Sequence, residues 1–154
     1  MGVEIERKFL VKSDSWKAAN PNGLHCKQGY LVADGKRTVR ARIMGDVGYL
    51  TVKGATSSIS RMEFEYEVDQ PDAAYMLMLC DDVVEKTRYF VEHDGNTWEL
   101  DVFEGANEGL IMAELELESE DQTFELPDWA GEEVSGDKRY YNAYLSRNPF
   151  KSWK

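Results

Sequence analysis

Hydrophobic and charged residues alternate along most of the chain. In the segment ISRMEFEYEV, at residues 59–68, apolar residues occupy nearly every second position and charged residues stand between them. A period of two places the two sets of side chains on opposite faces of a β-strand. The same alternation predicts strands at residues 3–12, 27–33, 37–44, 49–54, 59–68, 83–92, 97–103 and 111–118.

Turn signals join these segments, and few helices are predicted. Asp34-Gly35 and Asp94-Gly95 are typical of tight hairpin turns. We therefore expect a mainly β (α+β) fold, in which residues 1–154 form a single domain. The expected architecture is an eight-stranded antiparallel closed barrel with a few flanking helices. Proline or aspartate at helix-start positions predicts helices at residues 71–79 and 137–146, and a helical turn is expected at 13–19.

The polar faces of the predicted strands carry mostly charged residues, arranged as pairs of one sign at positions i and i+2. Two such side chains project from the same face of a strand, about 6.5–7 Å apart. A solvated outer face over an apolar core would carry mixed polar residues, without this segregation of sign. The acidic pairs are Glu4/Glu6, Glu63/Glu65, Glu99/Asp101 and Glu114/Glu116, and the basic pairs are Arg40/Arg42 and Lys86/Arg88.

We expect the charged faces to line the interior of the barrel and the apolar faces to point outward. So many inward charges would be too costly in a dry lumen, so the lumen must hold water, metal ions and a charged ligand. Glu4 and Glu6 are suited to a hard divalent cation, Mg²⁺ or Mn²⁺, with Lys8 contacting an anion beside it. Further basic residues are suited to an extended polyanion, namely Arg40, Arg42, Lys53, Arg61, Lys86 and Arg88. Helices or a second copy of the chain would cover the apolar outside, so a homodimer is a further expectation.

Charge and cysteine content exclude several classes of function. The net charge of −11, from 29 acidic and 18 basic residues, argues against nucleic acid or an anionic membrane as the main partner. Cys26 and Cys80 form no CxxC pattern, which argues against a disulfide framework and predicts a reducing, cytoplasmic location. No apolar stretch approaches the roughly 20 residues of a membrane span, and no signal peptide is visible.

The run Glu4-Ile5-Glu6-Arg7-Lys8 is an ExExK motif, and it resembles the signature of the CYTH domain, or triphosphate tunnel metalloenzyme, family. The opening EIERKFLV looks like that of short bacterial members. The resemblance covers essentially the whole chain, because further motifs follow in the expected order: Arg40-Ala41-Arg42, Thr51-Val52-Lys53-Gly54, Arg61 with Glu63 and Glu65, Lys86-Thr87-Arg88, Glu99-Leu100-Asp101 and Glu114-Leu115-Glu116.

The resemblance implies a barrel whose charged lumen binds a triphosphate together with divalent metal. It implies that the metal ligands are Glu4, Glu6, Glu114 and Glu116, with Asp101 or Glu63 as further candidates. The basic residues named above, with Lys8, would hold the phosphates. Lys138 matches a family lysine on a C-terminal helix that helps plug one mouth of the tunnel. Lys8 or Lys138 is the candidate catalytic residue that orients the water or assists the leaving group.

The expected activity is metal-dependent hydrolysis of the terminal phosphoryl group of inorganic tripolyphosphate or a similar compact triphosphate. An adenylate cyclase is an alternative within the same family, although no nucleoside-recognition motif is visible. A thiamine triphosphatase would need aromatic residues at a tunnel mouth, for which Trp16, Trp98 and Trp129 are candidates, with Trp98 expected on the outer face. A polyphosphate-binding module without catalysis is the third alternative, and the inward acidic pairs argue against it.

Overall fold

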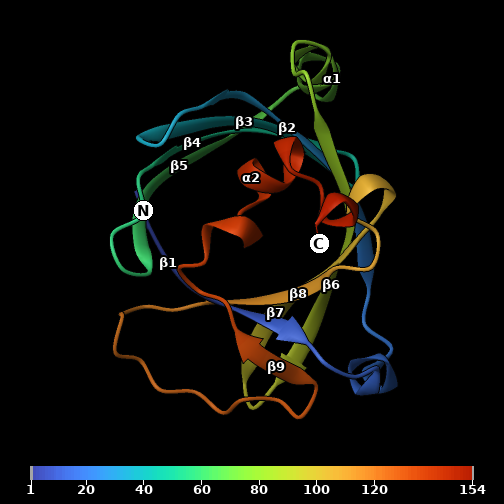
Figure 1. Ribbon diagram of the computed structural model, residues 1–154, viewed down its shortest axis with the longest axis vertical. Coiled ribbons are helices and arrows are strands. Elements are labelled where there is room, and N and C mark those ends of the chain that lie inside the picture. The colour runs from blue at the N-terminus through green and yellow to red at the C-terminus, as the bar shows by residue number, and fades with distance from the viewer. Residues whose placement is uncertain (1, 154) are drawn as a thin grey trace.

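The computed structural model describes residues 2–153. Within this range, nine strands form one antiparallel sheet that closes into a barrel (Figure 1). The strand order is β5-β4-β3-β2-β6-β7-β8-β1-β9, and β5 also pairs with β1, which closes the ring of the first eight strands. This confirms the predicted eight-stranded closed barrel. The strands are β1 (Val3–Val11), β2 (Gly23–Ala33), β3 (Arg37–Met44), β4 (Val47–Gly54), β5 (Ser60–Val68), β6 (Val83–His93), β7 (Asn96–Phe103), β8 (Ile111–Glu116) and β9 (Ala130–Glu133).

The barrel closes where β1 changes partners. The first residues of β1 pair with β5, placing Glu4 opposite Arg61. Residues 6–10 pair with β8, and Phe9 and Val11 also pair with β9. The ninth strand thus extends the sheet on β1 beyond the part that pairs with β5. The sequence pattern did not predict β9, because its four residues show no alternation.

Helical segments are short and lie in two different places. Helix α1 (Gln70–Met78) packs on the outside of β2, β3 and β4, with Ala73 and Leu77 buried. Gly48 on β4 permits this approach, because a Cβ there would lie 2.8 Å from the Ala73 Cβ. Helix α2 (Asn142–Arg147) and the C-terminal end lie within the ring of strands (Figure 1). The 3₁₀ turns are η1 (Ser15–Ala19), η2 (Gly105–Asn107), η3 (Lys138–Tyr140) and η4 (Phe150–Ser152).

The main hydrophobic core lies on the outer face of the barrel. Trp98, fully buried, is at its centre, with ring centroids 5.7 Å from Phe9, 5.7 Å from Phe124 and 5.5 Å from Trp129. Outward residues of β1, β6, β7 and β8 pack in this cluster beneath η1, β9 and the segment before β9. The apolar faces of these strands therefore point outward, as the alternation predicts.

A second apolar cluster fills part of the lumen. Val84, Phe103 and Met112 each stand two positions from a charged residue of the same strand, and they share its inward face. Leu145 of α2 packs against them, together with Phe150 and Trp153. The lumen is therefore charged along only part of its length, because the C-terminal segment fills the rest.

Among residues 2–153, no helix combines the length and apolar composition that a bilayer span requires.

Candidate active site

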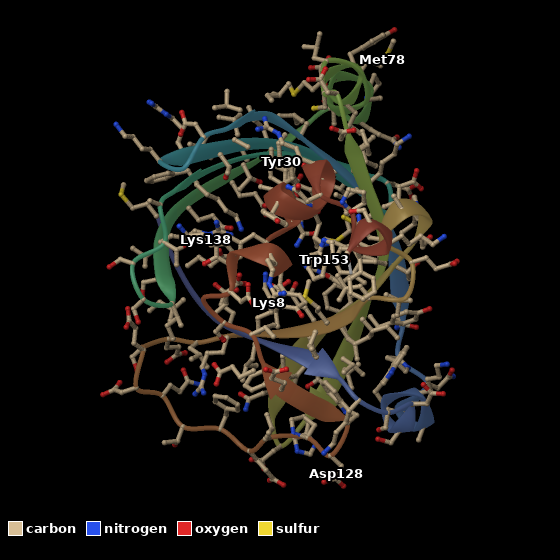
Figure 2. All side chains as sticks on the ribbon, in the orientation of Figure 1. Lys8, Tyr30, Met78, Asp128, Lys138 and Trp153 are labelled. Carbon is tan, nitrogen blue, oxygen red and sulfur yellow. The ribbon has the colours of Figure 1, made fainter. Side chains whose placement is uncertain are left out.

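A cavity of about 170 Å³ lies in the charged part of the lumen. Figure 2 shows Lys8 and Tyr30, two of its lining residues, within the ring of strands, whereas Met78 and Asp128 lie outside it. Because the charged pairs project inward from their strands, nearly all of their side chains reach this space, and Asp101 is the exception. Most of the predicted site residues line it: Glu4, Glu6, Lys8, Arg40, Arg42, Lys53, Arg61, Glu63, Lys86, Arg88, Glu114 and Glu116.

One wall of the cavity holds an excess of positive charge. Arg40 and Arg42 each donate from Nη2 to the same oxygen, Glu65 Oε2, at 3.2 Å. The Nε atoms of both arginines are buried and have no hydrogen-bond partner within residues 2–153. Burial, followed by the charges of Arg40 and Arg88, lowers the pKa of the Arg42 guanidinium. These cations are incompletely neutralised by the protein, as expected for a wall that binds an anion.

The adjoining wall, on β4, β5 and the start of β1, alternates acid and base. Lys53 Nζ lies 3.1 Å from Glu4 Oε1 and 3.1 Å from Glu63 Oε2, and Arg61 Nε lies 3.2 Å from the same Glu4 oxygen. Strand register explains these contacts, because Arg61 is paired with Glu4 and Lys53 with Glu63. Burial alone would raise the pKa of Glu4, but Lys53 and Arg61 outweigh it and hold that pKa below its usual value.

A third group of carboxylates, on β1 and β8, includes two, Glu6 and Glu116, whose charges neighbouring cations do not balance. Burial, followed by the charge of Glu114, raises the pKa of Glu6 well above its usual value. Burial, followed by the charges of Glu4 and Glu99, also raises the pKa of Glu116. Burial alone would raise the pKa of Glu114 too, but Lys8 and the hydrogen bond with Glu6 hold it well below its usual value. A divalent cation would relieve this concentration of negative charge.

The donor chemistry of this wall fits a hard cation, since all its candidate ligands are carboxylate oxygens. In the part of the chain that the structure describes, no three His, Cys, Asp or Glu side chains form a ready-made metal cluster. Glu6 stands opposite Glu116 and Glu114 stands opposite Lys8, so the wall is built from the β1 and β8 register. Metal binding therefore requires these side chains to converge by rotamer changes on fixed strands.

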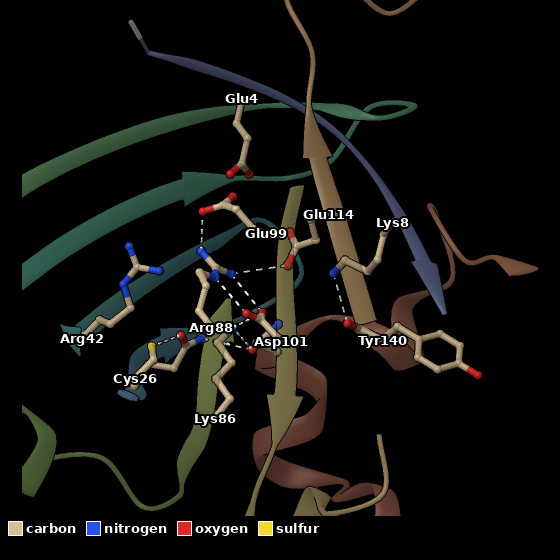
Figure 3. Close-up of polar contacts among 12 residues, drawn as sticks. Glu4, Lys8, Cys26, Arg42, Lys86, Arg88, Glu99, Asp101, Glu114 and Tyr140 are labelled. Carbon is tan, nitrogen blue, oxygen red and sulfur yellow. Dashed lines mark hydrogen bonds and ion pairs between the residues drawn. The ribbon is translucent and has the colours of Figure 1, made fainter. Parts of the chain in front are cut away.

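The base of the cavity is a buried ion-pair network, shown in Figure 3. Asp101 Oδ2 lies 2.8 Å from Lys86 Nζ, and Asp101 Oδ1 accepts a hydrogen bond from Arg88 Nε at 2.8 Å. Arg88 Nη1 also donates to Glu99 Oε2 at 2.9 Å. Lys86 and Arg88 line the cavity, whereas Asp101 lies behind them and does not. The geometry thus gives Asp101 the function of holding two cations in place.

The C-terminal segment completes the site from inside the barrel. Lys8 Nζ donates to the Tyr140 carbonyl oxygen at 3.1 Å (Figure 3). Asn142 Oδ1 accepts from Lys86 Nζ at 2.9 Å and from Gln28 Nε2 at 3.3 Å. Lys138, by contrast, is exposed and lies outside the charged cavity. It lines a neighbouring pocket of about 550 Å³, which we call the vestibule.

Several lining residues had no role predicted from sequence. Glu65 and Glu99 were predicted to face the lumen, as members of the pairs Glu63/Glu65 and Glu99/Asp101, but no binding or catalytic role was assigned to them. Other lining residues are uncharged and carry no periodic signal, namely Tyr30, Thr38, Tyr141, Asn142 and Ala143.

Comparisons with known proteins identify the family. Residues 2–141 match the family model described as the CYTH domain. This chain belongs to the CYTH domain family. An inorganic triphosphatase from Acetivibrio thermocellus is 48% identical over 156 residues, covering 100% of this chain and 99% of that protein. An inorganic triphosphatase from Nitrosomonas europaea is 40% identical over 153 residues, covering 94% of this chain and 97% of that protein.

The CYTH fold is also found among solved structures. A crystal structure of an inorganic triphosphatase superimposes with a TM-score of 0.66 at 37% identity, covering 93% of each chain. The similarity therefore extends over nearly the whole chain.

Proposed function

We propose that this CYTH protein hydrolyses the terminal phosphoryl group of inorganic tripolyphosphate, or of a similar compact triphosphate, with the help of Mg²⁺ or Mn²⁺. The observation that carries the proposal is the cavity itself. It is lined both by arginines whose positive charge the protein only partly neutralises and by carboxylates whose negative charge neighbouring cations do not balance. A polyanion and a cation bound together would satisfy both walls, whereas either alone would satisfy one. Full-length similarity to two proteins named inorganic triphosphatase supports the same reaction.

The basic residues would bind the phosphates and hold the scissile bond in place. Arginine guanidinium groups make forked contacts to phosphate oxygens, and lysines act as point charges. Arg40, Arg42 and Arg88 are largely buried, so the charge that they direct at the transferring group is little screened by water. Phosphoryl transfer depends mainly on such positioning and charge stabilisation.

Glu4, Glu6, Glu114 and Glu116 would hold the metal, with Glu63 as a further ligand. When bound, the metal supplies charge neutralisation and a more acidic water. Lys8 is fixed by the Tyr140 carbonyl and stands opposite Glu114, so it is placed to orient the water or assist the leaving group. Asp101 as a ligand and Lys138 as a catalytic group stay predictions, and the geometry gives them no support in those roles.

The alternatives fit the site less well. A cyclase must hold a nucleoside as well as phosphates, and the charged cavity of about 170 Å³ is below the range of about 300–1,000 Å³ that is usual for organic ligands, so the nucleoside would have to lie outside this cavity. For a thiamine triphosphatase, Trp16, Trp98 and Trp129 would have to line the mouth, but all three are buried in the outer core. A binding module without catalysis would not explain carboxylates that oppose polyanion binding.

We also propose that a second copy of the chain covers the outer face of β4 and β5. Met62 and Tyr66 are 57% and 63% exposed there, and Val3 on the adjoining part of β1 is 56% exposed. No outward residue of β4 or β5 is charged, so two chains of net charge −11 would repel each other least along this face. Analytical ultracentrifugation of wild type and Phe64→Glu would test this, with a dimer expected only for wild type.

Both cysteines are free thiols, which supports a cytoplasmic location.

The proposed reaction is tested by phosphate release from tripolyphosphate, ATP and thiamine triphosphate with Mg²⁺, Mn²⁺ or EDTA. We expect tripolyphosphate to be the best substrate and EDTA to abolish turnover. Glu114→Gln should lower kcat by about a hundredfold or more, whereas the matched control Glu118→Gln, at an exposed position, should not. Absence of turnover on every triphosphate, or formation of cyclic AMP from ATP, would overturn the proposal.

A further inference from the structure

Three cavities of the barrel meet at one aromatic residue. The charged cavity of about 170 Å³ adjoins a vestibule of about 550 Å³ and a small pocket of about 30 Å³. Tyr141 and Arg61 line all three. Thr38 and Ala143 line both the charged cavity and the vestibule. These four residues therefore form the boundary that the charged cavity and the vestibule share, and any passage between the two must run past them.

Contacts on both sides along the chain hold Tyr141 in this passage. The carbonyl of the preceding residue, Tyr140, accepts the hydrogen bond from Lys8, and the side chain of the following residue, Asn142, accepts one from Lys86. The Tyr141 ring centroid lies 5.3 Å from Lys8 Nζ and 5.8 Å from Arg61 Cζ. Two cations thus contact the ring, and any other group that stacks on it must compete with them.

The vestibule has the size for an organic group, and the charged cavity does not. Pockets for small organic molecules have volumes of about 300–1,000 Å³, a range that includes the vestibule only. A nucleoside triphosphate would place its phosphates in the charged cavity and its nucleoside in the vestibule. Its phosphate ester link would then have to cross the passage beside Tyr141. Inorganic tripolyphosphate carries no such group and requires no crossing.

We propose that Tyr141 determines specificity by closing this passage, so that the site accepts inorganic triphosphate and excludes nucleoside triphosphates. The inference rests on the proposed function and adds the residue that selects the substrate class. Exclusion follows from the position of Tyr141, since this residue lines both the charged cavity and the vestibule, between which the ester link would have to run. It also follows from the cost of removing the ring from Lys8 and Arg61, which both contact it.

The test is to remove the ring and compare ATP with tripolyphosphate. We expect Tyr141→Ala to raise kcat/KM for ATP by about tenfold or more, since pocket shape discriminates between related substrates by factors of this size. Hydrolysis of tripolyphosphate should fall, because Lys8 and Arg61 lose the ring that they contact. Tyr141→Phe keeps the ring and should keep the selectivity of wild type. Tyr144→Ala is the matched control, since Tyr144 lines the vestibule but not the charged cavity, and it should leave the ratio of the two substrates unchanged.

Linear tetraphosphate separates exclusion by width from exclusion by length, because it is longer than tripolyphosphate but equally slender. A gain for ATP without a matching gain for tetraphosphate in Tyr141→Ala supports the proposal. An unchanged kcat/KM for ATP, or equal gains for both compounds, overturns it. Binding of ATP and of tetraphosphate is also measured by calorimetric titration without divalent metal. This measurement requires no turnover, so it distinguishes failure of the present proposal from failure of the proposed function. If wild type shows no turnover, tighter ATP binding by Tyr141→Ala still supports the closed passage, and unchanged ATP binding overturns it.

Discussion

Lys86 Nζ lies 2.8 Å from Asp101 Oδ2, and each of the two side chains is only 1% exposed. The pairing of β6 with β7 brings them together, since Arg88 stands directly opposite Asp101 and Lys86 lies two residues before it. Asp101 also accepts hydrogen bonds from Arg88 Nε and Nη2, at 2.8 and 2.9 Å. One buried carboxylate therefore holds two cations that would otherwise be buried without a full countercharge.

The first prediction concerns this carboxylate. Asp101→Asn should lower the free energy of unfolding by about 3–5 kcal/mol near neutral pH, because it removes the buried carboxylate that Lys86 and Arg88 share. Urea unfolding followed by circular dichroism measures the change. Asp128→Asn, at an exposed position, is the matched control and should change stability little. A loss equal to that of the control would contradict the role assigned to Asp101.

The stabilising effect of Asp101 should also depend on pH. Burial alone would raise the pKa of Asp101, but Arg88 and then Lys86 outweigh it, so the folded-state pKa lies below the usual value. A carboxylate with a lowered folded-state pKa contributes its full stability above its unfolded-state pKa, about 3.9. That contribution is lost as pH falls through the folded-state pKa. The stability difference between wild type and Asp101→Asn should therefore be constant from about pH 7 to 5 and shrink below about pH 4. A constant difference down to about pH 2 would refute this explanation.

A third prediction separates activity from stability at Arg42. Arg42→Met should lower kcat/KM for tripolyphosphate by about 10²–10³-fold, because a preorganised charge at the phosphates is lost. The same substitution should leave the unliganded protein equally stable or raise its free energy of unfolding by about 0.5–2 kcal/mol. The reason is that Arg42 is repelled by Arg40 and Arg88, and Glu65 keeps its contacts with Arg40 and Thr51. Thermal unfolding and phosphate release are measured on the same sample, and a large loss of stability would contradict the prediction.

Strand parity predicted which side chains face the lumen, but not how they pair. Asp101 and Glu114 both point inward from acidic pairs, so the pattern within each strand treats them alike. The neighbouring strands distinguish them. Asp101 stands opposite Arg88, whereas Glu114 stands between Lys8 on one side and Glu99 on the other. Register between strands follows from closure of the whole barrel, and one strand's pattern does not encode it.

Other features of the fold depend on contacts between distant parts of the chain. Strand β9 follows a stretch without alternation, and its Glu133 is held by Arg7 of β1 at 2.6 and 2.8 Å. The apolar part of the lumen was also missed, because an inward Phe103 or Met112 looks like an ordinary core residue until the C-terminal segment is placed beside it. Helix 137–146 was predicted as one element, but the structure divides it into η3 and α2, with Tyr141 extended between them.

The fourth prediction tests whether the cation-rich wall binds phosphate without metal. Tripolyphosphate in the presence of EDTA should raise the stability of wild type, by about 2.7 kcal/mol at a concentration 100 times Kd. Arg42→Met should show a smaller increase at the same concentration, because one of the unneutralised cations is gone. Differential scanning fluorimetry across a tripolyphosphate titration measures both. Sulfate at equal ionic strength is the control, and equal stabilisation by both anions would indicate a general salt effect.

The last prediction concerns the plug formed by the C-terminal segment. Leu145 is fully buried against the apolar part of the lumen, so Leu145→Ala should cost about 2–5 kcal/mol of unfolding free energy. Leu126→Ala, at a residue that is 46% exposed, is the matched control. Helix α2 also carries Asn142, which holds Lys86 and Gln28. We therefore expect Leu145→Ala to lower kcat for tripolyphosphate even at temperatures where the variant is fully folded, because a loosened α2 no longer fixes Lys86. Full activity in a folded but destabilised variant would show that the plug stabilises the barrel without positioning its cations.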